Sequence, residues 1–541
     1  MHKRMRLALL AGQVDETRQS RFVNGFLQQA FSDDLDVCIF SMYRKYQSSL
    51  VREQAEMNIY NLFYPAIFDG IVILKDSIQT VPSSVPIEER IHETYTGPVL
   101  VIDRESDFFD NVFQDDYAGM SMVVNHMIKE HGYRDIAYIS GRKGHMHSVS
   151  RLQAFRDTMK AAHIPVDEDR IIYGDYWYSS GEQAVRQLAE ADRPLPDAIV
   201  CANDEMAIGV ASELTAMGLK IPEDVAVAGF DTSVEGRLSP QSITSCDMPY
   251  EEMGRYAVKY IKDRLDGHNP GHFTAKPEFT PGETCGCTSP ELKGYDPRRN
   301  EWATDRMNNS MYDVYNMMTK DIVTPSTLEE FFSTVYSYAY QIKDAENFSI
   351  CLSSPWKDLE DTPSMAMKHN GYPPKMIRAM KYNSITNEGT VDLDDTFSTR
   401  YLLPELGEDR EHPAAFCFTP FYCEDQCFGY AVISYGDKTV SHNEGYRRWM
   451  EYVSSGFELL RRTIAMNSYK NFIDNMKSNK FAVRLNPYDT LTDDEKRECE
   501  IVERILDENL ITYAFQPIVK ADILEARAEL RLSRALISMM R

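Results

Sequence analysis

The stretch from Asp197 to Ser233 limits the possible folds of this chain more than any other. It contains a short apolar run at Ala198 to Cys201, a polar turn, and then apolar residues at helical spacing that end before a glycine. A second apolar run follows at Val225 to Ala228. This order predicts a strand, a helix and a parallel strand joined by a right-handed crossover, which is the repeating unit of a doubly wound α/β sheet.

Polar residues follow the carboxyl ends of both predicted strands. Asn203 comes just after the first strand, and Asp231 follows the second. Open parallel sheets bind small ligands at this edge, so both side chains are candidates for a binding site. A local interpretation is also available, in which Asn203 caps the following helix and Asp231 starts a turn.

Several motifs give the chain a family resemblance. The segments ANDEMAIG and IPEDVAVAGFDTS, together with GYRDIAYISG and SVSRLQAF further upstream, resemble the effector-binding domain of the lac-repressor/galactose-repressor family. That domain is itself similar to periplasmic sugar-binding proteins. The resemblance covers about residues 1–290 and implies two doubly wound lobes, about 1–103 and 104–240, with later crossings. It also implies a ligand cleft between the lobes that closes by hinge motion.

The same resemblance implies which residues contact the ligand. Arg151 matches an arginine that stands three residues before a small residue and Phe, although Ala154 replaces the usual glycine. A polyhydroxylated ligand is expected, because hydroxyls both donate and accept and are held well by Asp, Asn and Arg. Tyr176 follows Gly-Asp, where an aromatic ring can stack on a sugar. The implied ligand-binding residues are Arg151, Asn203, Asp231, Tyr176, Asp103 and Gln13, with no cofactor.

Charge and composition narrow the partners. The formal net charge of -25 argues against nucleic-acid binding, since phosphate contacts need clustered Lys and Arg and no such run is present. In the family a DNA-reading helix-turn-helix precedes the first strand, and we expect it to be absent here. No apolar run reaches the length of a membrane span, and the cysteines are scattered mostly in apolar runs, as in a reducing cytoplasm. A cytoplasmic protein that contacts neither DNA nor a membrane is expected.

Two short patterns raise the question of a metal site. Cys285-Gly286-Cys287 has a single intervening residue and no second pair nearby in the sequence, which argues against structural zinc. His145 and His147 stand in a predicted loop without a third ligand nearby, and such histidines usually bind no metal. The sequence therefore predicts no metal centre.

A second domain is expected at 303–467, after a linker at 289–302. Its predicted elements are a helix, a strand, a hairpin turned by Glu424-Asp425 and a long helix from Tyr446 to Met466 with one apolar stripe. The order of these elements resembles a GAF-type sensory domain.

The remaining residues, 468–541, are expected to be a linker and an incomplete domain. The segment EIVERILDENLITYAFQPIVKA resembles the opening of an EAL domain, the cyclic-di-GMP phosphodiesterase fold. The Glu-Ala-Leu run and the acidic metal ligands of that fold do not follow. A truncated or frame-shifted EAL start and a plain helical tail both remain open.

These features together predict a cytoplasmic small-molecule sensor, related to proteins that turn over cyclic-di-GMP but itself non-catalytic. No phosphate-binding glycine loop, Gly-x-Ser-x-Gly elbow or His-Glu-x-x-His motif is present. Two alternatives stay open, a ligand-responsive transcription regulator of the lac-repressor family and an active cyclic-di-GMP phosphodiesterase. A homodimer is expected from the family's side-by-side packing and from the long helix.

Overall fold

The computed structural model describes residues 4–44, 49–78, 81–288, 314–353, 371–424 and 426–478. Residues Met1–Ile464 form one compact unit, and Ala465–Arg541 form a second, of which only the end of one helix is described. The predicted linker at 289–302 and the predicted EAL-like start lie outside the described residues.

The first lobe is a parallel sheet with the strand order β2-β1-β3-β4-β5. Its two longest strands have every residue buried, which explains why they read as continuous apolar runs rather than as alternating patterns. The strands are β1 (Arg6–Gly12), β2 (Asp36–Met42), β3 (Gly70–Leu74), β4 (Val99–Ile102) and β5 (Asp110–Val112), and the α-helices are α1 (Thr17–Ser32), α2 (Leu50–Met57), α3 (Lys75–Ile78) and α4 (Val81–Thr94).

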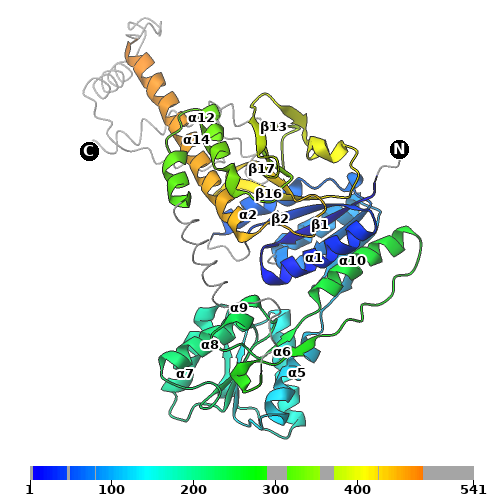
Figure 1. Cartoon of the computed structure of the whole chain (residues 1–541), viewed down its shortest axis with the longest axis vertical. Helices are drawn as coiled ribbons and strands as arrows, with labels where there is room; N and C mark the ends of the chain where they lie inside the picture. Colours follow the sequence, from blue (N-terminus) through cyan, green and yellow to red (C-terminus); the bar gives the residue numbers. More distant parts are fainter. Residues whose placement is uncertain are drawn as a thin grey trace, which may run out of the picture. The chain divides into compact units, whose positions relative to one another are not determined.

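The second lobe is a separate four-stranded parallel sheet with the order β7-β6-β8-β9. Ala198 pairs with Ala226 in parallel register across the predicted strand–helix–strand unit, so that unit is confirmed. Helices α7 and α8 pack against each other beside this sheet (Figure 1). The elements in chain order are α5 (Asp116–Lys129), β6 (Ile136–Ser140), α6 (Met146–Ala161), β7 (Ile171–Tyr173), α7 (Tyr178–Glu190), β8 (Ala198–Cys201), α8 (Asp204–Ala216), β9 (Ala226–Ala228) and α9 (Val234–Leu238).

The chain then crosses back to the first lobe and returns. After β10 (Ser245–Asp247), helix α10 (Tyr250–Leu265) packs on α1 of the first lobe. The two helices approach closely, since a Cβ on Gly25 would lie 2.0 Å from the Glu251 carbonyl oxygen. Strand β11 (Glu278–Thr280) pairs antiparallel with β10, and the short 3-10 helix η4 (Glu283–Cys285) contacts β9 of the second lobe. The result is the predicted two-lobed α/β fold.

The second predicted region contains an antiparallel sheet with the order β14-β13-β12-β17-β16. Helix α14 lies against it with Trp449, Val453, Phe457 and Leu460 buried, which confirms the predicted apolar stripe. Whether this region is a GAF domain stays a prediction. Its elements are α12 (Leu328–Ser337), β12 (Asn347–Ser353), β13 (Lys375–Asn383), β14 (Glu388–Val391), β15 (Thr396–Ser398), β16 (Ala415–Cys423), β17 (Gln426–Ser434) and α14 (Glu444–Ser478), with a further helix at 314–322.

The sheets of the first lobe and of this second region are continuous, which the sequence did not predict. Strand β16 pairs in parallel with β2, so that Ala415 lies opposite Val37 in one 11-stranded sheet. The rings of Phe40 and Phe418 stack across the junction at 5.0 Å. Strand β2 would otherwise expose a row of unpaired backbone groups at a sheet edge, and β16 satisfies them.

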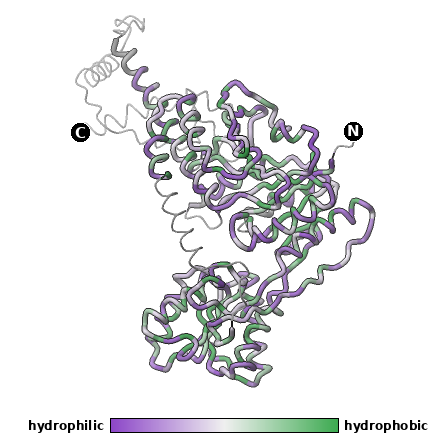
Figure 2. The backbone as a smooth tube through the Cα atoms, viewed as in Figure 1, coloured by the Kyte–Doolittle hydropathy of each residue, from purple (hydrophilic) through white to green (hydrophobic). Residues whose placement is uncertain are grey.

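Hydrophobic residues concentrate along the strands of both sheets, whereas hydrophilic and hydrophobic residues alternate along the helices (Figure 2). Among the described residues, no helix is long and apolar enough to cross a membrane.

Candidate ligand-binding site

Arg151 and Asp231 meet at the carboxyl edge of the second-lobe sheet. Asp231 follows β9 with a φ of 96° and keeps 26% of its side chain exposed. One of its oxygens lies 3.6 Å from Arg151 Nη2 and accepts a hydrogen bond of 2.9 Å from the Tyr250 hydroxyl. The Arg151 guanidinium stands 3.8 Å from the centroid of the Phe230 ring. Two residues predicted for the ligand site are therefore neighbours.

A buried carboxylate, Asp116, holds Arg151 in place. Arg151 Nε donates to Asp116 Oδ1 at 2.8 Å, and its Nη1 donates to the Ala202 carbonyl at 2.6 Å. His147 Nδ1 donates to the other oxygen of Asp116 at 2.5 Å. Burial opposes ionisation of Asp116, but Arg151 and His147 outweigh it and hold the pKa of this carboxyl well below its usual range.

The first lobe contributes buried aspartates, each paired with an arginine, at the carboxyl ends of its own strands. Asp103 follows β4 with a φ of 63° and accepts from Arg18 Nη2 at 2.5 Å. Arg18 Nη1 also lies 3.5 Å from Asp76, which accepts from Arg104 Nε at 3.0 Å. Asp103 and Asp76 are both buried, so each needs these guanidinium partners.

Contacts between Asp76 and two histidines connect the lobes. His145 Nε2 lies 3.5 Å from one Asp76 oxygen and His147 Nε2 lies 3.6 Å from the other. Burial disfavours the charged imidazole of His147, but Asp116 and Asp76 outweigh burial and raise its pKa to about 9. The prediction that the two histidines stand in a loop is wrong for His147, which lies in the first turn of α6, whereas His145 ends the preceding loop as the N-cap of that helix.

Asn203 and Tyr176 form the rim of the second-lobe edge. Asn203 Oδ1 accepts from the Met206 N–H at 3.2 Å and so caps α8, which confirms the local interpretation for this atom. Its Nδ2 donates to the Tyr176 carbonyl at 3.0 Å. The Tyr176 hydroxyl forms a hydrogen bond with Ser148, and burial raises the pKa of Tyr176 to about 12. Both side chains thus have protein partners.

Gln13 lies at the carboxyl end of β1 in the first lobe. Its backbone adopts a φ of 54°, with its N–H donating to Met42 and its carbonyl accepting from Glu16. These backbone hydrogen bonds of Gln13 are those of a turn, whereas Asp103, at the end of β4, joins the charged group through its side chain.

Five members of the charged group were missed from the sequence: Arg18, Asp76, Asp116, His147 and Tyr250. They lie on α1, α3, α5, α6 and α10, and only the fold brings these helices to one place. The one available signal was position, since Arg18 and Asp116 each stand in the first turn of a helix at the carboxyl edge of a sheet. We call the set Arg18, Asp76, Asp103, Asp116, His147, Arg151, Asp231 and Tyr250 the interlobe network.

Two further carboxylates crowd the start of α8 beside this network. Asp204 is buried and accepts from the Ser233 N–H at 2.6 Å and from the Ser245 hydroxyl at 2.7 Å. Burial raises the pKa of Asp204 to about 7, and burial together with Asp231 raises that of Glu205 to about 8. Both carboxyls are therefore partly protonated near neutral pH, where they can donate as well as accept hydrogen bonds, and a ligand hydroxyl suits either role.

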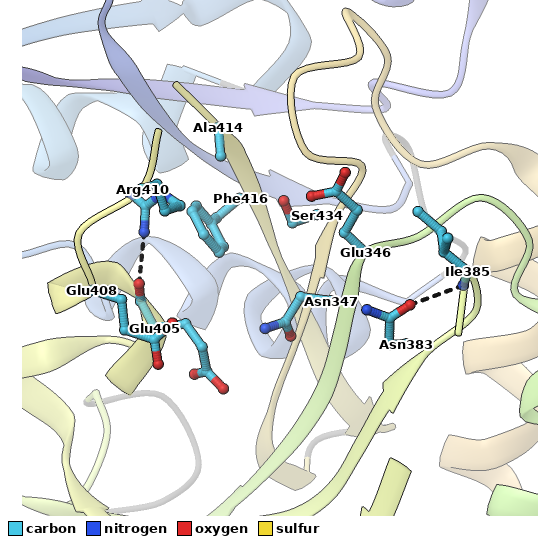
Figure 3. Close-up of a pocket in the computed structure, with 10 residues that line it drawn as sticks. All are labelled: Glu346, Asn347, Asn383, Ile385, Glu405, Glu408, Arg410, Ala414, Phe416 and Ser434. Atoms are coloured by element: carbon cyan, nitrogen blue, oxygen red, sulfur yellow. Dashed lines mark hydrogen bonds between the residues drawn. The ribbon is translucent and has the colours of Figure 1, made fainter. Parts of the chain in front are cut away.

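A separate cavity of about 350 Å³ lies in the second region (Figure 3). Arg410 Nη1 donates to the Glu405 carbonyl there at 2.6 Å, and Arg410 Nη2 donates to Asp36 at 2.6 Å. The Arg410 guanidinium therefore already has protein partners at the junction between β16 and β2. For this reason the interlobe network is the stronger candidate site. The lining residues are Glu346, Asn347, Asn383, Ile385, Glu405, Glu408, Arg410, Ala414, Phe416 and Ser434.

Comparison with known proteins adds a family context to this geometry. A family model described as a periplasmic binding protein-like domain matches residues 124–285. The HTH-type transcriptional regulator CelR of Thermobifida fusca is 32% identical over 199 residues, which are 37% of this chain and 57% of that protein. The HTH-type transcriptional repressor PurR of Photorhabdus laumondii is 31% identical over 171 residues, covering 31% and 50%. The chain spans about half the length of the curated relatives it matches.

Solved structures align with about half of the chain. A LacI family transcriptional regulator from Mycobacterium smegmatis has a TM-score of 0.44 and 19% identity, covering 51% of this chain and 98% of that one. A structure titled as a complex of the transcriptional regulator CelR with cellobiose has a TM-score of 0.43 and 25% identity, covering 52% and 86%.

The fold, the site and the family match define an α/β domain of the periplasmic-binding-protein-like class. The curated relatives that match this part of the chain are HTH-type transcriptional regulators and repressors.

Proposed function

We propose that the chain is a ligand-responsive regulator whose two-lobed domain binds a small polar effector between the lobes. The relatives named above are transcriptional regulators and repressors, which favours control of transcription over the predicted role in cyclic-di-GMP signalling. The prediction that the chain is non-catalytic, and the prediction of a homodimer, form part of this proposal.

The observation that carries the proposal is the spacing of Arg151 and Asp231. Their nearest atoms are 3.6 Å apart, beyond hydrogen-bond length, and Asp231 is partly exposed. A ligand hydroxyl placed between them would accept from the guanidinium and donate to the carboxylate. Arg151 is meanwhile fixed by Asp116 and Ala202, so it is oriented before the ligand arrives.

Both lobes supply polar groups to the same network, which couples ligand binding to lobe closure. Asp76 of the first lobe contacts His145 and His147 of the second. A ligand that adds contacts to both lobes favours the closed arrangement by its differential affinity for it. The predicted ligand is polyhydroxylated, and the Asp231 carboxylate can accept hydrogen bonds from such hydroxyls.

The continuous sheet offers a route from this domain to the second region. Strand β2 belongs to the first lobe and pairs directly with β16. A conformational change of the first lobe could therefore reach the proposed GAF-like relay through the pairing of β2 with β16. It would not need the linker at 289–302. The EAL-like start has no part in this mechanism.

A ligand screen by thermal shift, followed by calorimetry, tests the proposal. Sugars, nucleosides, purines and amino acids form the library, and Arg151→Ala is the test variant with exposed Asp192→Ala as its control. Wild type and Asp192→Ala should bind one compound class with equal affinity, and Arg151→Ala should not. A ligand that binds all three equally would place the site elsewhere.

Selection from a random DNA pool at about 150 mM salt, with and without the ligand found, tests the regulatory role. Recovery of a defined sequence whose affinity changes with ligand would support transcription control. Ligand binding without any sequence selection would contradict it and favour a sensor that acts on another partner.

A further inference from the structure

A second polar cluster lies apart from the interlobe network and uses different chemistry. It consists of His126, His131, Cys285 and Cys287, whose nitrogen and sulfur atoms all lie within 4.8 Å of one another. His126 is in the last turn of α5, and His131 is in the turn that follows this helix. Cys285 ends η4, and Cys287 stands two residues further on. We call these four side chains the Cys/His cluster.

The distances within the cluster match those around one tetrahedral ion. Zinc–sulfur bonds of about 2.3 Å and zinc–nitrogen bonds of about 2.0 Å place sulfur and nitrogen ligands about 3.5 Å apart, and two nitrogens about 3.3 Å apart. Cys285 Sγ and Cys287 Sγ each lie 3.4 Å from His126 Nε2, and Cys287 Sγ lies 3.4 Å from His131 Nε2. The two Nε2 atoms are 3.1 Å apart.

The backbone and neighbouring rings hold these four groups in that arrangement. Gly286 has a φ of 97°, a left-handed conformation that other residues rarely adopt, and it turns the chain between the two cysteines. The ring of Phe279 packs on His126 with centroids 4.2 Å apart. Tyr133 stacks on His131 at 5.6 Å with an angle of 18° between the rings. Both imidazoles are thus oriented by contacts outside the cluster.

We propose that the Cys/His cluster binds one zinc ion through two thiolates and two neutral imidazoles. Four protein ligands fill a tetrahedral site and leave no open position for water or substrate, so the ion has a structural role. The four ligand atoms surround a single point, which suits one ion rather than a two-iron cluster with its ligands divided between two metals.

The proposed ion ties the end of the effector-binding domain to its second lobe. Cys285 and His126 are 159 residues apart. Strand β11, which precedes η4, pairs antiparallel with β10 and packs against α5. A zinc ion cross-links this closing segment to α5 in a reducing environment, where a disulfide would not persist. The expectation that Cys285-Gly286-Cys287 lacks further ligands is corrected by His126 and His131, which no sequence spacing links to it.

The test is the metal content of tag-free protein purified under reducing conditions without chelator. Wild type should retain about one zinc ion per chain after gel filtration. Inductively coupled plasma mass spectrometry of the eluted protein measures this zinc content. Cys285→Ser/Cys287→Ser and His126→Asn/His131→Asn should lose it. Cys423→Ser and His268→Asn change the same residue types elsewhere and should keep the wild-type content.

Cobalt substitution of the wild-type chain gives a second readout that needs no variant to fold. The apo protein titrated with Co²⁺ should develop the intense visible bands of a tetrahedral site together with thiolate-to-metal charge transfer, saturating at one equivalent. Addition of Zn²⁺ should abolish these bands.

Two results would overturn the proposal. The first is a reduced, folded wild-type chain that takes up neither zinc nor cobalt, in which case the cluster is a set of hydrogen bonds between thiols and imidazoles. The second is full zinc content in the folded Cys285→Ser/Cys287→Ser variant, which would put the ion elsewhere. Failure of a variant to fold leaves the decision to the cobalt titration.

Discussion

The interlobe network and the Cys/His cluster are both polar groups in the same α/β domain, yet they differ in how their charges are balanced. In the network each guanidinium already faces a carboxylate, such as Arg151 with Asp116 and Arg18 with Asp103. In the Cys/His cluster, two imidazoles and two thiols face one another without any carboxylate or guanidinium among them. The first arrangement is complete by itself and can exchange a partner for a ligand hydroxyl. The proposed zinc ion would complete the second once both thiols lose their protons.

Removal of Asp116 breaks the balance of the network most severely. Asp116→Ala removes the hydrogen-bonded carboxylate of the buried Arg151 and His147 and leaves them the carboxylates of Asp231 and Asp76, each 3.6 Å away. Loss of one partner of a buried ion pair costs about 3–5 kcal/mol. Denaturant unfolding of the variant measures it, with Asp192→Ala as a surface control that should stay close to wild type. A loss below about 1 kcal/mol would mean that the network is less tightly coupled than its distances indicate.

Zinc removal should separate the two clusters. If free zinc stands 100-fold above its Kd, binding to the folded chain alone stabilises it by about 2.7 kcal/mol. A chelator should therefore lower the Tm of wild type and of Asp231→Ala equally, but leave Cys285→Ser/Cys287→Ser unchanged. An equal fall in Tm of all three proteins would show that the chelator does not act through the Cys/His cluster.

Asp231→Ala should affect the ligand and not the fold. Charge-assisted hydrogen bonds contribute about 1.5–3 kcal/mol, so effector affinity should fall roughly ten- to a hundredfold. Stability should change little, because Asp231 is partly exposed and Arg151 keeps its bond to Asp116. Calorimetry and thermal unfolding on the same variant measure both quantities. Unchanged affinity with a lowered Tm would show that Asp231 is a turn residue.

The smallest effect, counted per pH unit, is the pH dependence of the network. The folded-state pKa of His147 is raised to about 9 from an ordinary value of 6.5, so its stabilisation is complete below pH 6.5 and is lost as pH rises towards 9. The raised pKa values of Asp204 and Glu205 act in the same direction between about pH 4 and 8, because the unfolded chain ionises first.

Each pH unit in the His147 window should therefore cost at most about 1.4 kcal/mol. Unfolding free energies measured from pH 6 to 9 in wild type and in His147→Gln test this. The variant should show a flatter curve, and an equally steep one would assign the dependence to the carboxylates beside α8.

Local signals account for what could be predicted from the sequence. Thr327 caps α12 by accepting from the Glu330 N–H, and the Glu330 carboxylate accepts from the Ser326 N–H. Strands β16 and β17 form the predicted hairpin, and Glu424 in its turn has a φ of 51°. Each of these depends on residues a few positions apart, so a short window contains all the information.

Of the candidate site, the sequence supplied Arg151, Asp231 and Asp103, which the structure joins to one network. Each of these three residues stands within a recognisable motif or directly after a predicted strand. Asp76 and Asp116 could not be found in this way, because a lone acidic residue near a helix start is common. Their importance comes from the charges that the fold brings to them.

The sequence by itself determined the α/β class, the strand–helix–strand unit at Asp197 to Ser233 and the carboxyl edge where ligands bind, because apolar periodicity and caps are written locally. Only the tertiary structure decided that β16 extends the first-lobe sheet at β2, and that His126 meets Cys285. A strand edge accepts any partner of the right length, and a metal site needs only that its ligands converge in space. Neither condition produces a recognisable spacing of residues in the sequence. Both contacts therefore depend on how segments distant in the sequence pack together.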